Sequence, residues 1–202
     1  MSRLRDFLNH PYTFWALLCL PAIPALNLLL SDNPKAIHIA VHPTGEFAAR
    51  FMIIALMITP LTLLLPSWRG PRWLMKRRRY LGVAAFLYAL AHLTLYLIDK
   101  GAVAWTQAEL MKLHIWTGWV ALLIFAPLAI TSTDGWVRSL GPKWKQMQRW
   151  VYAAAALTLI HWACLHEWKG AGPALVHFAP LALLTGYRSY WNLSRRRARA
   201  AA

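Results

Sequence analysis

The sequence is poor in charged residues, above all in acidic ones. Only 14% of its 202 residues are charged and only seven are Asp or Glu, whereas soluble domains carry about 25% charged residues. In contrast, 58% of the residues are hydrophobic and twelve residues are Trp. These proportions exclude an ordinary soluble domain and indicate a protein whose apolar side chains face lipid.

Cysteines are few, and nucleotide-binding motifs are absent. Cys19 and Cys164 lie in apolar runs and form no CxxC pair, so the sequence indicates neither a disulfide framework nor a thiolate metal site. The chain has no GxGxxG motif and no P-loop. Any nicotinamide or flavin-reductase chemistry would therefore have to come from another protein.

The net charge of +15 does not indicate a nucleic-acid partner. A nucleic-acid binder carries its basic residues over a water-exposed surface. Here Lys and Arg occur in short clusters between apolar runs, so we exclude a soluble nucleic-acid binder. The clusters can also bind anionic membrane lipid.

Six apolar runs are long enough to cross about 30 Å of hydrocarbon. They cover residues 13–30, 47–66, 80–98, 114–133, 150–168 and 174–191. The first run is interrupted by Pro21 and Pro24 and precedes no A-x-A site, so we interpret it as a membrane helix and not as a cleaved signal peptide. The sequence thus predicts an all-α polytopic membrane bundle of six helices in a single domain, 1–202.

The distribution of Lys and Arg predicts the orientation of this bundle. Five of the 22 basic residues fall on one side, together with five of the seven acids, and the other 17 fall on the opposite side. Because cytoplasmic loops carry the excess of Lys and Arg, we expect both termini in the cytoplasm. The third and fifth runs then point outward in the same direction.

Two of the eight histidines lie deep inside these runs. His92 is twelve residues past Tyr80 and His161 is eleven past Trp150. At 1.5 Å per residue both imidazoles lie roughly 16–18 Å from the cytoplasmic edge. Their runs contain no proline, whereas the other four do. Two imidazoles at one depth on straight, co-directional helices are what an axially bis-histidine b-type haem needs.

The sequence leaves other interpretations of this histidine pair open. Each residue alone could be a hydrogen-bonded packing residue, and the pair could act as a proton relay in a small transporter. No carboxylate accompanies the pair at that depth, which argues against a relay and against a tetrahedral or carboxylate-rich metal site. Thirteen residues before these two histidines the chain has Arg79 and Gln148, neither of which is a usual haem ligand. We therefore expect one haem.

Further candidates gather near the expected outer face. His42, His114, His166 and His177 are interfacial residues or serve haem propionates, a quinone or an electron acceptor. Arg50 lies four residues after Glu46. It either pairs with that carboxylate or clamps a haem propionate.

Four stretches of the chain resemble the MsrQ/YedZ family. They are HPTGEFAARFMIIALMITPL (42–61), RRRYLGVAAFLYALAHLTLY (77–96), APLAITSTDGWVRSLGPKWKQMQRWVY (126–152) and LIHW (159–162). This family comprises the haem-bearing membrane subunits of the periplasmic methionine-sulfoxide reductase system, in the ferric-reductase-like transmembrane superfamily. The resemblance implies a bacterial inner-membrane protein.

The resemblance also implies cofactors, partners and site residues. Electrons would pass from the quinone pool, or from a cytoplasmic flavin reductase, through haem b and FMN to a periplasmic molybdopterin enzyme that reduces methionine sulfoxide in oxidised proteins. His92 and His161 match the family's haem histidines, and His42 matches a histidine before the second helix. Where members commonly carry a further histidine, this chain has Gln148, which again implies a single haem. The alternative within the same superfamily is a stand-alone transmembrane ferric or quinone reductase.

Overall fold

The structure is a computed structural model that describes residue 7 and residues 10–165 and 167–200. Within these residues it is all-α, as predicted, with no strand. The helices are α2 (Pro11–Cys19), α3 (Ala22–Leu29), α4 (Ala36–Leu64), α5 (Arg69–Met75), α6 (Arg78–Lys100), the 3₁₀ helix η1 (Gly101–Trp105), α7 (Gln107–Leu110), α8 (Leu113–Ile130), α9 (Asp134–Leu140), α10 (Pro142–Gln148), α11 (Val151–Ala163) and α12 (Ala171–Ala200).

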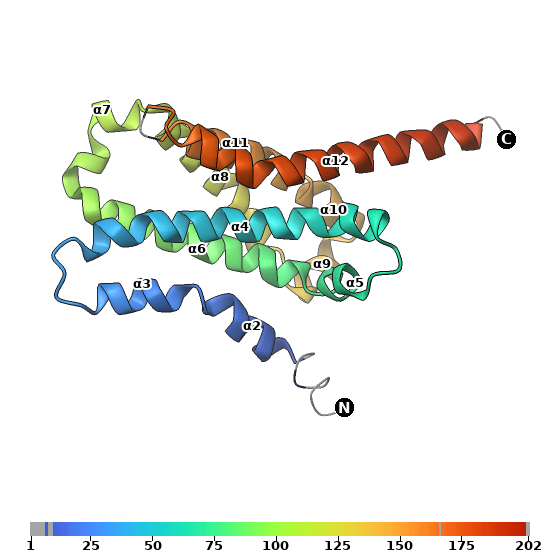
Figure 1. The fold of residues 1–202 in the computed structure, drawn as a ribbon, viewed down its shortest axis with the longest axis horizontal. Helices are drawn as coiled ribbons and strands as arrows, with labels where there is room; N and C mark the ends of the chain where they lie inside the picture. Colours follow the sequence, from blue (N-terminus) through green and yellow to red (C-terminus); the bar gives the residue numbers. More distant parts are fainter. Residues whose placement is uncertain (1–6, 8–9, 166, 201–202) are drawn as a thin grey trace.

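The long helices lie side by side and form an elongated bundle (Figure 1). Successive long helices run in opposite directions, so that α6 and α11 run the same way, as the sequence predicts for the third and fifth runs. The short helices α5, α9 and α10 gather at one end of the bundle, and α7 lies at the other. We refer to these as the α10 end and the α7 end.

Among the described residues, three helical segments are long and apolar enough to cross a membrane: Ala36–Leu64, Arg78–Trp105 and Leu113–Ile130. A fourth span is formed if α2 and α3, which meet at a bend of 52°, are counted together. Pro21 lies at this bend. Because proline lacks the backbone N–H that a continuous helix requires, the helix is interrupted there. The chain is therefore a multi-pass membrane protein.

The last two predicted spans differ from their expected bounds. α11 has 13 residues and ends at Ala163, five residues before the predicted end at 168. Beyond it Glu167 and Trp168 adopt positive φ angles, a conformation that does not continue a right-handed helix. α12 extends to Ala200 and carries the arginine-rich tail as a helix. Neither helix is among the three or four candidate spans.

The second predicted span also begins earlier than expected. α4 starts at Ala36, eleven residues before the predicted start at 47. Its first turns bury Ala36, Ala40 and Thr44 on one face, which continues the packed face of the later turns, and Pro43 is accommodated inside the helix. His42 therefore lies within a helix and not in a connection before it, which corrects the sequence-based expectation.

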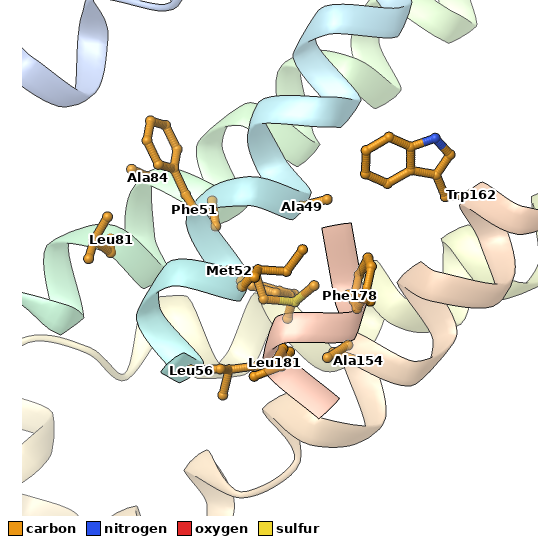
Figure 2. Close-up of a cluster of buried hydrophobic side chains, with 14 of the residues drawn as sticks. Ala49, Phe51, Met52, Leu56, Leu81, Ala84, Ala154, Trp162, Phe178 and Leu181 are labelled. Atoms are coloured by element: carbon orange, nitrogen blue, oxygen red, sulfur yellow. The ribbon is translucent and has the colours of Figure 1, made fainter. Parts of the chain in front are cut away.

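The core of the bundle is centred on α4. Its residues Met52, Ile58 and Pro60 are less than 2% exposed. Figure 2 shows Met52 among side chains of α11 and α12, with Phe178 and Leu181 on one side of it. Ala154 on α11 is completely buried where these helices meet, since a small side chain allows the backbones to approach closely.

Candidate functional site

The structure brings His92 and His161 together. His92 extends from α6 and His161 from α11, and their ring centres are 6.1 Å apart with ring planes at 89°. Both histidines are on proline-free helices that run in one direction. The two residues that the sequence places at one depth thus form a pair in the α7 half of the bundle.

Each histidine has one ring nitrogen fixed by a helix backbone. His92 Nδ1 lies 2.8 Å from the carbonyl oxygen of Val41 on α4. His161 Nδ1 makes the same kind of bond with the carbonyl of His114 on α8. Because a carbonyl oxygen can only accept, each Nδ1 carries the proton and donates it. Each Nε2 is then the nitrogen with a free lone pair, and no other described residue bonds to it.

A glycine lies under each of the two rings. A Cβ added at Gly45 on α4 would meet His92 Nδ1 at 2.8 Å, and one added at Gly118 on α8 would meet His161 Nδ1 at 2.8 Å. Both distances are shorter than real Cβ contacts. Glycine is therefore the residue that allows each imidazole to lie directly against the neighbouring helix.

A threonine also contacts the backbone carbonyl that holds each ring. We call each set of carbonyl, threonine and glycine around a histidine a ring seat. The Thr44 hydroxyl is shared between the carbonyls of Val41 at 2.8 Å and Ala40 at 2.9 Å. The Thr117 hydroxyl is shared between the carbonyls of Leu113 at 2.9 Å and His114 at 3.1 Å. In each case the threonine bonds to the same carbonyl oxygen that accepts the histidine Nδ1–H.

The two seats therefore repeat, as Val41-Thr44-Gly45 around His92 and His114-Thr117-Gly118 around His161. Sequence reasoning missed this repeat. The signal was present as a Thr-Gly dipeptide in two apolar segments, although a third one, Thr185-Gly186 on α12, has no ring against its glycine.

A cavity of about 150 Å³ lies between α4, α6, α8 and α11 and contains the histidine pair. We call it the histidine cavity. Its wall is mostly apolar and includes Ala49, Met52, Ala85, Ala89, Ile115, Ala121, Leu122 and Phe125. Ala85 and Ala89 are two of the small residues near His92 in the sequence. The cavity offers a flat ligand an apolar environment with two imidazoles.

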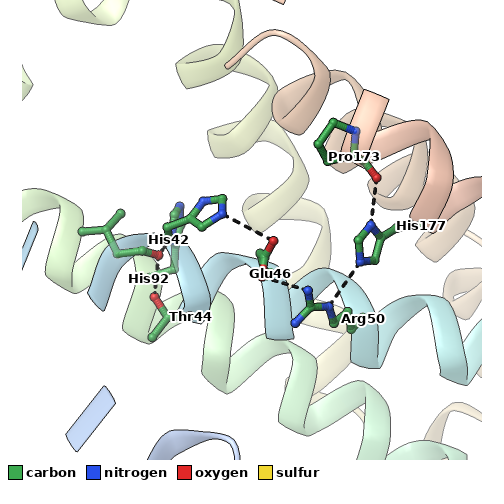
Figure 3. A network of polar contacts seen from close by, with 8 residues as sticks. His42, Thr44, Glu46, Arg50, His92, Pro173 and His177 are labelled. Carbon is green, nitrogen blue, oxygen red and sulfur yellow. Dashed lines mark hydrogen bonds and ion pairs between the residues drawn. The ribbon is translucent and has the colours of Figure 1, made fainter. Parts of the chain in front are cut away.

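The polar residues expected at the outer face form a chain of contacts beside this cavity (Figure 3). Arg50 donates to Glu46 at 2.8 Å and to His177 Nε2 at 3.4 Å, and His177 Nδ1 donates to the carbonyl of Pro173. His42 Nε2 lies 3.4 Å from the Glu46 carboxylate. Arg50 thus makes the pairing with Glu46 that was one of its two predicted alternatives. His42 and Glu46 line the histidine cavity.

The other outer-face candidates have different positions. The ring centres of His114 and His161 are 6.3 Å apart, and the His114 backbone carbonyl accepts the hydrogen bond from His161 Nδ1. His177 packs against Trp162, with ring centres 4.8 Å apart. His166 lies outside the described residues.

One carboxylate at the α7 end has an altered acidity. Glu109 accepts hydrogen bonds from Lys112 and from the Tyr96 hydroxyl, the latter at 3.0 Å. The Lys112 ammonium lowers the pKa of Glu109 below its ordinary value of 4.5, and the Tyr96 bond lowers it further. Glu109 therefore stays ionised at the membrane edge, where it joins α6 to the start of α8.

Two imidazole nitrogens alone are too few to complete the coordination of a metal ion. The histidine pair therefore fits a metal group that brings further donor atoms of its own. The described residues contain no group of three or more His, Cys, Asp or Glu side chains that could hold a metal ion. The two Nε2 atoms of His92 and His161, whose ring centres are 6.1 Å apart, would hold a haem iron, with the haem supplying the remaining donors.

Fold and site together define a polytopic helical membrane protein with a paired-histidine centre. Residues 44–159 match the family described as ferric reductase like transmembrane component. This region contains Thr44-Gly45, Thr117-Gly118 and His92, and it ends two residues before His161.

The relatives narrow this class. The chain is 40% identical over 162 residues to a protein-methionine-sulfoxide reductase heme-binding subunit MsrQ of Xanthomonas oryzae, covering 79% of this chain and 72% of the relative. The corresponding protein of Xanthomonas campestris is 41% identical with the same coverage. That of Azospira oryzae is 33% identical over 186 residues, covering 86% and 76%. The chain belongs to the MsrQ family of ferric-reductase-like transmembrane proteins. No solved structure matches it.

Proposed function

We propose that this chain is the haem-binding membrane electron-transfer subunit of a methionine-sulfoxide reductase system. Its relatives are named as heme-binding subunits of such a reductase. The observation that carries the proposal is the pair of neutral imidazoles 6.1 Å apart, each with Nδ1 engaged and Nε2 free.

His92 and His161 would hold one haem b through their Nε2 atoms. The haem would supply a one-electron ferric/ferrous couple. The carbonyls of Val41 and His114 keep each ring in the tautomer that ligation needs and fix its orientation. A haem is larger than the histidine cavity of about 150 Å³, so we expect side chains at the cavity rim to move apart when it binds.

A single haem is also supported by the residues thirteen positions before the ligands. The Gln148 side-chain amide donates to the carbonyl of Leu128 at 3.0 Å. Arg79 pairs with Asp134 at 2.6 Å. Neither side chain is a usual haem ligand, and both have other partners.

The residues around the pair have separate roles in this proposal. The apolar wall excludes water and keeps both imidazoles neutral. Arg50, held by Glu46 and His177 near the middle of α4, would orient a haem propionate beside the histidine cavity. His42 would contribute to the same polar rim, and His114 and His177 would border the route by which electrons leave.

We further propose six membrane passes with both termini in the cytoplasm of a bacterial inner membrane. α2 begins and α12 ends toward the α10 end of the bundle (Figure 1), which supports termini on one side. Electrons would enter from membrane quinol or a cytoplasmic flavin reductase, with FMN as a further carrier. They would leave at the α7 end to a periplasmic molybdopterin methionine-sulfoxide reductase.

The test is the visible spectrum of the purified protein, oxidised and dithionite-reduced, with pyridine-haemochrome quantification. We expect a reduced b-type α-band, one haem per chain, and loss of the band in His92→Ala and His161→Ala. The matched control is His38→Ala, because His38 is an exposed histidine paired with Asp99 outside the cavity. A full spectrum in His92→Ala would refute the assignment of the ligands.

The electron-transfer part has its own test. The dithionite-reduced protein in lipid vesicles should be reoxidised when the periplasmic reductase and methionine sulfoxide are added together. Reoxidation at the same rate without the reductase would contradict the proposed partner.

A further inference from the structure

A second cavity lies toward the α10 end of the bundle, away from the histidine pair. Its volume is about 280 Å³ and it is formed by residues of α4, α6, α8, α10, α11 and α12. We call it the basic cavity. Met52 and Phe125 line both cavities and therefore lie between them.

Five cationic side chains line the basic cavity, and no described Asp or Glu does. The five are Arg78, Arg79, Lys145, Arg149 and Arg188. The acid that contacts this group is Asp134, which binds Arg79 at 2.6 Å from a side chain that is 71% exposed. One carboxylate thus offsets one of the five charges.

The remaining cations have neutral partners or none among the described residues. Arg188 donates to the Tyr152 hydroxyl at 2.7 Å, and Arg78 lies 3.4 Å from the Thr59 hydroxyl. The side chains of Lys145 and Arg149 make no hydrogen bond or ion pair within the described part of the chain. Hydroxyl groups do not neutralise these charges, so the cations repel one another around the hollow.

Membrane topology alone does not explain this arrangement. The preference for Lys and Arg on the cytoplasmic side requires basic residues near the helix ends. It does not require that cations from α6, α10 and α12 converge on one hollow. Hydrogen-bonding groups converge there as well, on Thr59, Ser132, Gln148 and Tyr152.

We propose that the basic cavity is a binding site for a phosphate-bearing ligand. A phosphate group offsets several positive charges at once and accepts several charge-assisted hydrogen bonds, for which guanidinium groups are well suited. The apolar floor formed by Met52 and Phe125 would contact the organic part of the ligand. The phosphate belongs either to a soluble phosphate ester or to a phospholipid headgroup.

The experiment measures binding to the full-length protein in two arms. In the soluble arm, the protein in neutral detergent is titrated calorimetrically with glycerol 3-phosphate, with glycerol as the uncharged comparison. In the lipid arm, native mass spectrometry counts phosphatidylglycerol bound from mixed micelles, with phosphatidylcholine as the zwitterionic comparison. Binding in the first arm identifies a soluble ester, and selective binding only in the second identifies a lipid.

The decisive variant is Lys145→Gln/Arg149→Gln, because both side chains are exposed at the cavity edge and their replacement leaves the core intact. We expect its affinity in the positive arm to fall at least tenfold. The matched control, Arg196→Gln/Arg197→Gln, removes the same charge from the exposed end of α12 and should bind as the unmodified protein does. Absence of binding in both arms, or an equal loss in both variants, would overturn the proposal.

A second readout rests on the proposed haem. Because the cavities share Met52 and Phe125, a phosphate bound in the basic cavity should lower the midpoint potential of a haem at His92 and His161, and the double variant should not show this shift. The binding measurement requires no haem. Failure of the proposed function and failure of the phosphate site are therefore distinguishable.

Discussion

The two glycines beneath the histidine rings give the sharpest prediction. In Gly118→Ala the new Cβ would lie 2.8 Å from His161 Nδ1 and 3.0 Å from its Cε1, and Gly45→Ala would place a Cβ 2.8 and 2.9 Å from the same atoms of His92. Ordinary contacts begin near 3.4 Å. Each ring must therefore move away from its neighbouring helix by several tenths of an ångström.

That movement acts on the one hydrogen bond that fixes each ring. His92 Nδ1 is 2.8 Å from the Val41 carbonyl, and a ring displaced from the helix stretches this bond. Loss of such a bond costs about 1 kcal/mol in stability. Loss of an outer partner of a metal-bound histidine typically lowers metal affinity about 10- to 100-fold. We expect both alanine variants to fold but to hold haem at least tenfold more weakly.

The assay is haem retention during titration with apomyoglobin, which captures released haem, followed by the decay of the α-band. The control is Gly186→Ala on α12, where an added Cβ meets nothing within 4 Å. In a helix this change is neutral or stabilises by about 0.5–1 kcal/mol, so haem retention should be unchanged. Retention in Gly45→Ala and Gly118→Ala equal to that in Gly186→Ala would refute the role of the glycine seats.

Three further predictions follow from neighbouring contacts. Thr117→Val removes a hydroxyl donor from the His114 carbonyl, which also accepts His161 Nδ1–H. The bond from His161 should then strengthen and lower the haem midpoint potential in a redox titration, and Thr117→Ser should restore the potential. Arg50→Gln removes a cation near the proposed propionates and should also lower the haem midpoint potential. An unchanged potential would mean that Arg50 only pairs with Glu46 and does not contact a propionate. For Glu109, whose pKa is lowered from 4.5, the stabilising contribution is present above pH 4.5 and is lost as the pH falls through the lowered pKa. The melting temperatures of the unmodified protein and Glu109→Gln should therefore converge in acid.

The long apolar helices and the histidine pair could be predicted from sequence because both depend on simple lengths. A helix rises a fixed distance per residue, so the spacings of twelve and eleven residues from the starts of their runs place His92 and His161 at nearly equal depth. The absence of proline from the same two runs predicts straight helices. These arguments need no knowledge of the neighbouring helices.

The rest of the site depends on neighbours and could not be predicted in the same way. The close approach of the histidine rings to Gly45 and Gly118 becomes visible only when α4 lies against α6 and α8 against α11. The start of α4 at Ala36 was missed because the run was counted from Phe47, after the polar residues around Glu46. The early end of α11 reflects the two positive φ angles after it, which hydropathy does not encode.

The central claim is that His92 and His161 are the two axial ligands of one haem, and the most direct test is chemical rescue. Purified His92→Gly and His161→Gly are reconstituted with haem in the absence and presence of imidazole, and the reduced α-band and haem per chain are measured. The account predicts a weak or absent band without imidazole and recovery toward one haem per chain with it, for each variant separately. A full band without imidazole, or no recovery in a variant that is folded by circular dichroism, would contradict it.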